Sequence, residues 1–197
     1  MYDVLPSFIL GFHGCDRTVA EQVFAGAASL KPSVNDFDWL GHGVYFWENN
    51  PARAMEYAAH LSAHPRKVGP RIKDPAVVGA VIDLGRCLNL LDHTMIELVR
   101  MGYTRLSKLS EQANVPLPQN VGGSDLLRRY LDCAVVEEVH STPGVEPFDT
   151  VRGVFVEGAP IYPGAGFHEK SHIQVCVREA SCIKGYFRVM PEALPHS

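Results

Sequence analysis

Residues 40–48 read Leu-Gly-His-Gly-Val-Tyr-Phe-Trp-Glu, and the fold that we predict starts from these nine residues. The run of valine, tyrosine and phenylalanine favours a strand, and alternation turns the ring of Tyr45 to the face opposite its two neighbours. Two glycines leave the backbone bare just before that strand. The chain then enters a helix, because Asn50 is a preferred N-cap residue and Pro51 suits the first helical position.

Upstream of this stretch, an apolar run over residues 7–12 predicts a buried strand that ends at His13 and Gly14. The spacing of Thr18 and Glu21 is typical of a capping box, which predicts a short helix after that strand.

Downstream, the hydrophobic pattern predicts helices between groups of strands. The expected elements are an interior strand at 76–84, helices at 93–101, 105–113 and 124–139, the last capped by Ser124, and strands at 151–156, 172–177 and 183–189. We therefore expect an α+β architecture, with residues 1–197 forming a single domain.

The composition is that of an ordinary globular protein, with 46% hydrophobic residues, 20% charged residues and a formal net charge of −4. This acidic excess argues against a surface built for nonspecific binding of nucleic acid. The five cysteines form no Cys-x-x-Cys pair, which is typical of free thiols in a reducing compartment. Residues 1–10 lack the basic region of a signal peptide, and no apolar stretch approaches the roughly 20 residues that span a bilayer. We expect a cytoplasmic protein that does not bind a membrane.

The order of the two glycine motifs resembles the ADP-ribosyltransferase superfamily, in its bacterial, poly(ADP-ribose)-polymerase-like branch. In that superfamily a His-Gly pair and a Gly-x-Gly-[Ile/Val]-Tyr-Phe element hold the nicotinamide end of NAD, and this chain has both in the same order. The resemblance is concentrated in residues 8–60 and 165–190. Residues 38–43 and 172–174 are also similar to a largely uncharacterised group of bacterial proteins.

The resemblance implies a role for each matching residue. His13 would hydrogen-bond a ribose hydroxyl of NAD, and the backbone of Gly14 would bind the nicotinamide amide. Tyr45 and Tyr57 would hold the nicotinamide ring between them, and Gly43 would clear backbone space beside it. Each position also has an ordinary alternative, because a packed core contains histidines and tyrosines whose hydrogen bonds are satisfied internally.

The third motif of the family is a glutamate at the start of a late strand, which holds a ribose hydroxyl and stabilises the cation that develops as the glycosidic bond breaks. Alternation puts His172 and Gln174 on the face opposite the aliphatic residues of 173–177, so Gln174 takes the position of that glutamate. Its amide can accept the hydroxyl hydrogen bond but brings no negative charge. Glu169, in the loop before the strand, and Glu157 are alternative sources of charge, and the choice among the three stays open.

The fold implied by the resemblance is a split antiparallel β-sandwich around an NAD cleft, with helices on its flanks. NAD would be consumed as a substrate, without a metal, and ADP-ribose would pass by single transfer to an unknown macromolecular or small-molecule acceptor. The net charge of −4 favours a protein slightly over a nucleic acid as that acceptor. If the chain is a toxin, a cognate neutralising partner is expected as well.

Several alternatives stay open beside this reading. The chain could hydrolyse NAD, or modify a nucleic acid guided by the basic residues of one loop, which are Arg66, Lys67, Arg71 and Lys73. An RNA 2′-phosphotransferase shares the NAD cleft but needs further clustered arginines that the sequence lacks. An inactive module that binds NAD or ADP-ribose is the alternative from a different class, and Gln174 favours it.

Two other constellations are unfavourable. Cys15 lies two residues from His13, but no orienting asparagine or aspartate accompanies them. His60 and His64 are four residues apart, but Leu61 stands where a His-Glu-x-x-His metal site has its glutamate. The sequence therefore favours neither a cysteine nucleophile nor a metal site.

Overall fold

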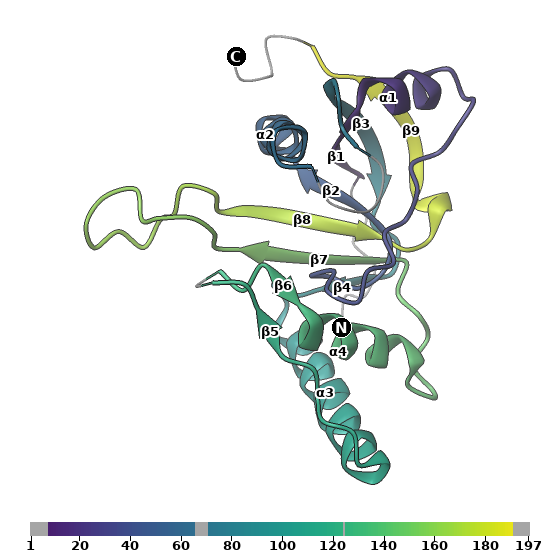
Figure 1. Cartoon of the computed structure of the whole chain (residues 1–197). Helices are drawn as coiled ribbons and strands as arrows, with labels where there is room; N and C mark the ends of the chain where they lie inside the picture. Colours follow the sequence, from purple (N-terminus) through teal and green to yellow (C-terminus); the bar gives the residue numbers. More distant parts are fainter. Residues whose placement is uncertain (1–7, 66–70, 124, 191–197) are drawn as a thin grey trace.

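The computed structural model describes residues 8–65, 71–123 and 125–190 (Figure 1). Ser124, Arg66 and Lys67, for which the sequence predicted a helix cap and part of a basic loop, lie outside the described residues, as do residues 1–7. In chain order the elements are β1 (Phe8–Asp16), α1 (Arg17–Phe24), β2 (Val44–Glu48), α2 (Pro51–Ala63), β3 (Pro75–Asp83), β4 (Cys87–Asn89), α3 (His93–Ala113), β5 (Asn120–Val121), β6 (Arg128–Arg129), α4 (Tyr130–Ser141), β7 (Thr150–Phe155), β8 (His172–Val177), a 3-10 turn (Ala180–Cys182) and β9 (Ile183–Arg188).

Seven strands form one sheet in the order β4-β7-β8-β2-β1-β3-β9. β4 and β7 run parallel, and every other neighbouring pair is antiparallel. A parallel pair needs a long crossover, and the segment that contains α3 and α4 provides it. The prediction of an α+β architecture is confirmed at this level, and the large sheet is mixed because β4 and β7 run parallel.

The sheet is least paired at its middle, between β1 and β2. β1 pairs with β3 along its whole length, but it shares only two residue pairs with β2, Gly11 with Glu48 and Phe12 with Trp47. In Figure 1, β7 and β8 run across the view whereas β1, β3 and β9 run steeply through it. The two strands therefore separate after Phe12, and we call this place, between residues 13–16 and 44–46, the β1/β2 joint.

Three hydrophobic clusters pack the helices against the sheet. The first joins α1 to β1, β3 and β9 and contains the completely buried Phe46. The second joins α3 and α4 to β4, β7 and β8 around Leu40, and the third packs Ala54 of α2 on Trp47. Because Phe46 and Trp47 are neighbours in β2, the first and third clusters lie on opposite faces of the sheet.

α2 begins as the sequence predicts. The Asn50 side chain accepts a hydrogen bond of 3.1 Å from the Arg53 amide, and Pro51 is the first helical residue. Ala54 is completely buried, and a Cβ added to Gly14 would stand 2.1 Å from its carbonyl oxygen. Gly14 is therefore required for the close approach of α2 to β1.

α1 is capped differently from the prediction, and the predicted capping box of Thr18 and Glu21 is wrong. The N-cap is Asp16, whose Oδ1 accepts from the Thr18 amide at 3.0 Å. Its Oδ2 accepts from the Lys73 amide at 2.7 Å, and Glu21 pairs with Arg188 of β9 instead. Hydrogen bonds from the Thr18 hydroxyl and from backbone amides hold the pKa of Asp16 well below its usual range. Contacts from distant segments thus decide this cap.

The helices predicted at 93–101 and 105–113 are one continuous helix, α3. A Cβ added to its Gly102 would stand 2.6 Å from Cγ2 of Val139, so this glycine serves close packing on α4 and does not break the helix. The helix predicted at 124–139 begins only at Tyr130, because the β5/β6 hairpin precedes it. None of the helices in the described part of the chain combines the length and apolar character needed to cross a membrane.

Candidate functional site

His13 lies one residue past the last pair between β1 and β2. Its Nδ1 is 2.8 Å from the carbonyl oxygen of Tyr45, so Nδ1 carries a proton and donates it to that carbonyl. The ring thus bridges the joint where backbone pairing has stopped. Burial lowers the pKa of His13, although the Tyr45 hydrogen bond opposes this, and the ring is neutral near pH 7. Its Nε2 therefore offers a lone pair that can accept a hydrogen bond from a hydroxyl group.

Gly14 presents its backbone to the same joint. Alternate residues of an antiparallel strand direct their N–H and C=O toward the same neighbour, and the Leu10 carbonyl accepts from Asn49 on the β2 side. Phe12 and Gly14 therefore direct theirs that way too, and pairing with β2 ends at Phe12. One backbone donor and one backbone acceptor at a strand edge match a carboxamide, which carries one group of each kind.

Tyr45 is held by the loop that precedes β2. Its hydroxyl donates to the Gly41 carbonyl at 2.7 Å and accepts from the Leu40 amide at 2.8 Å. Its ring packs in the second hydrophobic cluster, and burial raises the pKa of its hydroxyl. Gly43 lies against β8, because an added Cβ would stand 2.5 Å from Sγ of Cys176. These contacts fasten the glycine loop to β8.

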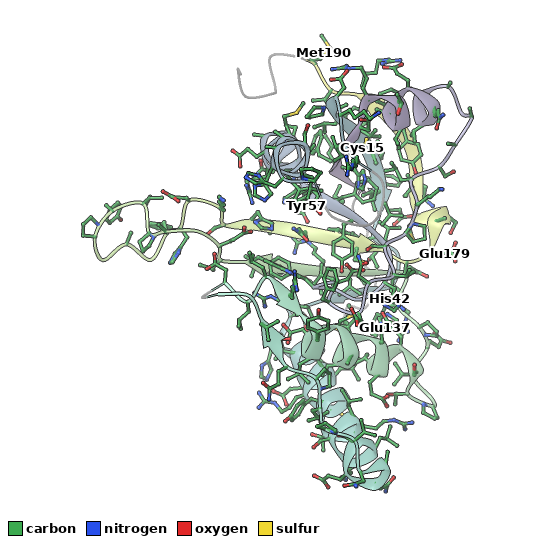
Figure 2. All side chains as sticks on the ribbon, viewed as in Figure 1. Cys15, His42, Tyr57, Glu137, Glu179 and Met190 are labelled. Atoms are coloured by element: carbon green, nitrogen blue, oxygen red, sulfur yellow. The ribbon has the colours of Figure 1, made fainter. Side chains whose placement is uncertain are left out.

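Tyr57 faces Trp47, and the structure places the two tyrosines in different clusters. The ring centroids of Tyr57 and Trp47 are 4.9 Å apart, in the third cluster under α2. Figure 2 shows Tyr57 between α2 and β8. Nε1 of Trp47 is buried and has no hydrogen-bond partner among the described residues. Tyr45, two residues earlier on the same face of β2, lies in the neighbouring cluster.

Gln174 lies on β8 opposite Trp47. Its Nε2 is 2.9 Å from Nε2 of His172, whose Nδ1 is 2.6 Å from the carbonyl oxygen of Lys170. Burial lowers the pKa of His172. Alternation along the strand predicted that Gln174 and His172 share a face, and their contact confirms it.

The two glutamates considered as third-motif acids differ in placement. Glu157, two residues past β7, lies 3.9 Å from Nδ1 of His172 and 3.5 Å from Nη2 of Arg53. Glu169 is exposed in the β7–β8 loop, where its amide donates to the Ala159 carbonyl. No hydrogen bond or ion pair joins the Glu169 side chain to another residue in the described ranges. Of the two, only Glu157 belongs to the group of side chains that we call the β8 cluster, which consists of Trp47, Arg53, Tyr57, Glu157, His172 and Gln174.

An ion pair fastens the loop that carries Gly41 and Gly43. Glu137 of α4 accepts two hydrogen bonds from Arg178, of 2.6 and 3.0 Å, and a third of 2.8 Å from the His42 amide. Arg178 also donates to the His42 carbonyl at 3.1 Å. Figure 2 shows His42 and Glu137 on the α4 side of β7, away from Tyr57. His42 thus belongs to an anchor of the loop and not to the β8 cluster.

The constellations that the sequence disfavoured have no reactive geometry. Cys15 is buried, and burial together with the neighbouring Asp16 raises the pKa of its thiol to about 11. Because the thiolate is the nucleophile, this side chain is unreactive near pH 7. His60 and His64 stack on each other at the exposed end of α2, with ring centroids 4.6 Å apart. Within the residues that the structure describes, no group of three or more His, Cys, Asp or Glu side chains could hold a metal ion.

Sequence patterns assigned no role to three residues of the β8 cluster, Trp47, Arg53 and His172. Alternation could have found Trp47, since it stands two residues beyond Tyr45 on the same face of β2. The contact of Arg53 with Glu157 has no local signal, because the two residues meet only when α2 packs near the end of β7.

No protein-family model, curated protein or solved structure matches the chain significantly. The functional conclusion therefore depends on the residues of the joint and of the β8 cluster. In the sheet β2 lies between these two groups, since the Tyr45 carbonyl holds His13 on one side and Trp47 opposes Gln174 on the other. α2 contacts both groups, because its Ala54 lies against Gly14 and its Tyr57 packs on Trp47.

Proposed function

We propose that this chain is an ADP-ribosyltransferase-like enzyme, which cleaves the bond between nicotinamide and ribose in NAD and passes ADP-ribose to an acceptor. The observation that carries the proposal is the β1/β2 joint, where a neutral histidine bridges the separated strands beside a backbone segment that no longer pairs with β2. The short pairing of β1 with β2 also supports the finer fold of the proposal, a split sheet around an NAD cleft.

In this proposal the edge of Gly14 binds the carboxamide of nicotinamide, and Nε2 of His13 accepts from a ribose hydroxyl. Tyr57 contributes an aromatic wall for the nicotinamide ring. Both hydrogen bonds of the Tyr45 hydroxyl are made within the loop, so we assign Tyr45 mainly to positioning His13 through its carbonyl. The carboxamide fit matters most, because a site built from paired donors and acceptors rejects a ligand that leaves them unpaired.

The reaction needs little covalent participation by the protein. The C1′–N bond breaks, its electron pair leaves with nicotinamide, and the ribose becomes an oxocarbenium-like cation. A nucleophile of the acceptor then attacks C1′ and its proton passes to water. Gln174 would accept from a ribose hydroxyl without adding negative charge, and Arg53 offsets the charge of Glu157 at 3.5 Å. The loss of one preorganised electrostatic contact costs about 10²–10³ in rate, so we expect slow turnover.

A protein side chain is the acceptor that we propose first. Binding of nucleic acid draws most of its affinity from Lys and Arg contacts to phosphates, and the formal net charge of this chain is −4. Hydrolysis of NAD, with water as the nucleophile, follows the same steps and is the neighbouring outcome.

A module that binds NAD or ADP-ribose without turnover is the second candidate, and one observation favours it. The residue that opposes Trp47 on β8 is the uncharged Gln174, and the exposed Glu169 has no contact with the cluster. Such a module needs the joint but not a charge for the developing cation.

One experiment with two labels separates these candidates. The purified protein is incubated with NAD labelled in nicotinamide or in the adenylate group, while calorimetry measures binding of NAD. Free nicotinamide with label on protein identifies a transferase, and free nicotinamide alone identifies a hydrolase. Binding without release identifies a binding module. If the protein neither binds NAD nor releases nicotinamide, the proposal is rejected. If nuclease removes the label and protease does not, the acceptor is a nucleic acid.

A further inference from the structure

The contact between Gln174 and His172 determines which way the amide of Gln174 points. Nδ1 of His172 lies 2.6 Å from the Lys170 carbonyl oxygen, so Nδ1 carries a proton and donates. In a neutral ring Nε2 then has no proton and accepts from the amide nitrogen of Gln174, 2.9 Å away. The carbonyl oxygen of the Gln174 amide is therefore turned away from His172.

His172 has little freedom to move. None of its side chain is exposed, and its ring centroid lies 6.3 Å from Trp47 and 5.7 Å from Phe155. Trp39 lies 6.5 Å away on the loop side, with the guanidinium of Arg129 stacked 4.4 Å from the Trp39 ring centroid. Rings from β2, β7 and the loop thus hold the imidazole against its neighbour on β8.

Two charged groups face this imidazole. Oε2 of Glu157, beyond the end of β7, lies 3.9 Å from Nδ1, and Arg53 of α2 lies 3.5 Å from the same carboxylate. Burial lowers the pKa of His172, the Lys170 carbonyl raises it, Arg53 lowers it and Glu157 raises it, with a net lowering. The ring is therefore neutral near pH 7 and gains a proton only in more acidic solution.

We propose that His172 is a positioning residue that presents the carbonyl oxygen of Gln174 to a ribose hydroxyl of the substrate, and that protonation of His172 reverses the amide. The inference rests on the proposed function, because it explains how the hydrogen-bond acceptor of the same site, the carbonyl oxygen of Gln174, is oriented. Once Nε2 carries a proton it becomes a donor, and the carbonyl oxygen of Gln174 turns to accept from it. The amide NH₂ group then faces the substrate and cannot accept the hydroxyl proton.

A carboxylate at the same position escapes this control, because both of its oxygens accept hydrogen bonds. Gln174→Glu therefore removes the requirement for orientation and adds the charge that a developing cation needs. His172→Phe keeps a ring among Trp47 and Phe155 but removes the acceptor, and His172→Gln returns an acceptor without a group that titrates. These three variants separate orientation from packing and from charge.

The first test uses the ligand-free protein. The side-chain amide resonances of Gln174 and the ring nitrogens of His172 are followed by NMR from about pH 8 to about pH 5. We expect the Gln174 resonances to shift with the midpoint of His172, and to lose this dependence in His172→Phe. His64→Phe, at the exposed end of α2, is the matched control and keeps it. If the Gln174 resonances do not shift while His172 titrates, the inference is overturned.

The second test measures nicotinamide release from NAD against pH. For the native protein we expect the rate to fall in acid solution, with a midpoint at the titration of His172; we call this fall the acid limb. His172→Phe should lose the acid limb, and its kcat should be about 3–10-fold lower. His172→Gln should recover the rate but not the acid limb. Gln174→Glu should lose the limb while it keeps or raises the rate. A limb that persists in His172→Phe would contradict the inference. If NAD is not cleaved at all but the Gln174 amide still follows His172, the proposed function fails while the coupling of the two side chains stands.

Discussion

The chain contains two His-Gly pairs, and the fold uses them in opposite ways. His13 and Gly14 border the β1/β2 joint, where the ring bridges two separated strands and Gly14 lies beyond the last residue pair with β2. His42 and Gly43 are enclosed by other groups, since Glu137 and Arg178 bind the backbone of His42 and Gly43 lies under β8. The same dipeptide therefore lies beside an unpaired strand segment in one place and anchors a loop in the other. Strand pairing makes the difference, because backbone groups bind a ligand only where no neighbouring strand takes them.

The largest expected effect separates the two histidines by activity. His13→Ala removes the hydroxyl acceptor at the joint and should lower kcat/KM for nicotinamide release by about 10²–10³. His42→Ala should leave the rate near that of the native protein, because the hydrogen bonds of His42 with Glu137 and Arg178 come from its backbone. The variant loses only the contact between the half-exposed His42 ring and Glu137, whose nearest atoms are 3.7 Å apart. The rates are measured with proteins whose folding has been checked by circular dichroism. Equal losses in both variants would remove the distinction.

The glycines of both pairs should be intolerant of a side chain, for reasons of packing. A Cβ at Gly14 would stand 2.1 Å from the Ala54 carbonyl oxygen, and one at Gly43 would stand 2.5 Å from the Val177 carbonyl oxygen. Each alanine variant should therefore lower the free energy of unfolding in denaturant by about 1–3 kcal/mol, with Gly14→Ala the worse because α2 must shift. Gly185→Ala on β9 has open space and is the control. A neutral Gly14→Ala would mean that α2 is not packed tightly on β1.

The anchor around His42 can be weakened without touching the joint. Glu137→Gln keeps the shape but loses the charge that faces Arg178, both side chains being partly buried, and should cost about 1–2 kcal/mol in the free energy of unfolding. Glu146→Gln, whose carboxylate is exposed and 3.9 Å from Arg86, should have no measurable effect. Equal effects of the two substitutions would show that the anchor adds no more than a surface ion pair.

The smallest expected effect is the acid dependence of stability. Burial lowers the pKa of His13 in the folded state, so the unfolded chain binds more protons as the pH falls below about 6.5. The free energy of unfolding should therefore decrease with falling pH, with a limiting slope of about 1.4 kcal/mol per pH unit for each such histidine. Burial lowers the pKa of His140 and His172 as well, so His13→Ala should reduce the slope without abolishing it. An unchanged slope in denaturant melts of His13→Ala would contradict a buried neutral ring at this position.

Much of the local structure could be predicted, because short-range periodicity and capping act within a few residues. The strand that begins at Val44, the Asn50 cap and the shared face of His172 and Gln174 all follow from such rules. The cap of α1 does not, because Asp16 also binds amides from the segment before β3. The break expected near Gly102 fails for the same kind of reason, since packing on α4 decides what that glycine does.

Local sequence predicts which residues alternate, which begin helices and which lack a side chain, because these properties belong to the residue and its near neighbours. The packing of distant segments is what separates β1 from β2 after two pairs, brings Tyr57 onto Trp47 and places Arg53 beside Glu157. The folded chain also places one His-Gly pair where β1 and β2 separate, whereas Glu137 and β8 contact the backbone of the other. A backbone edge or an imidazole is available to a ligand only where no other segment occupies it, and which segment comes close depends on how the entire chain packs.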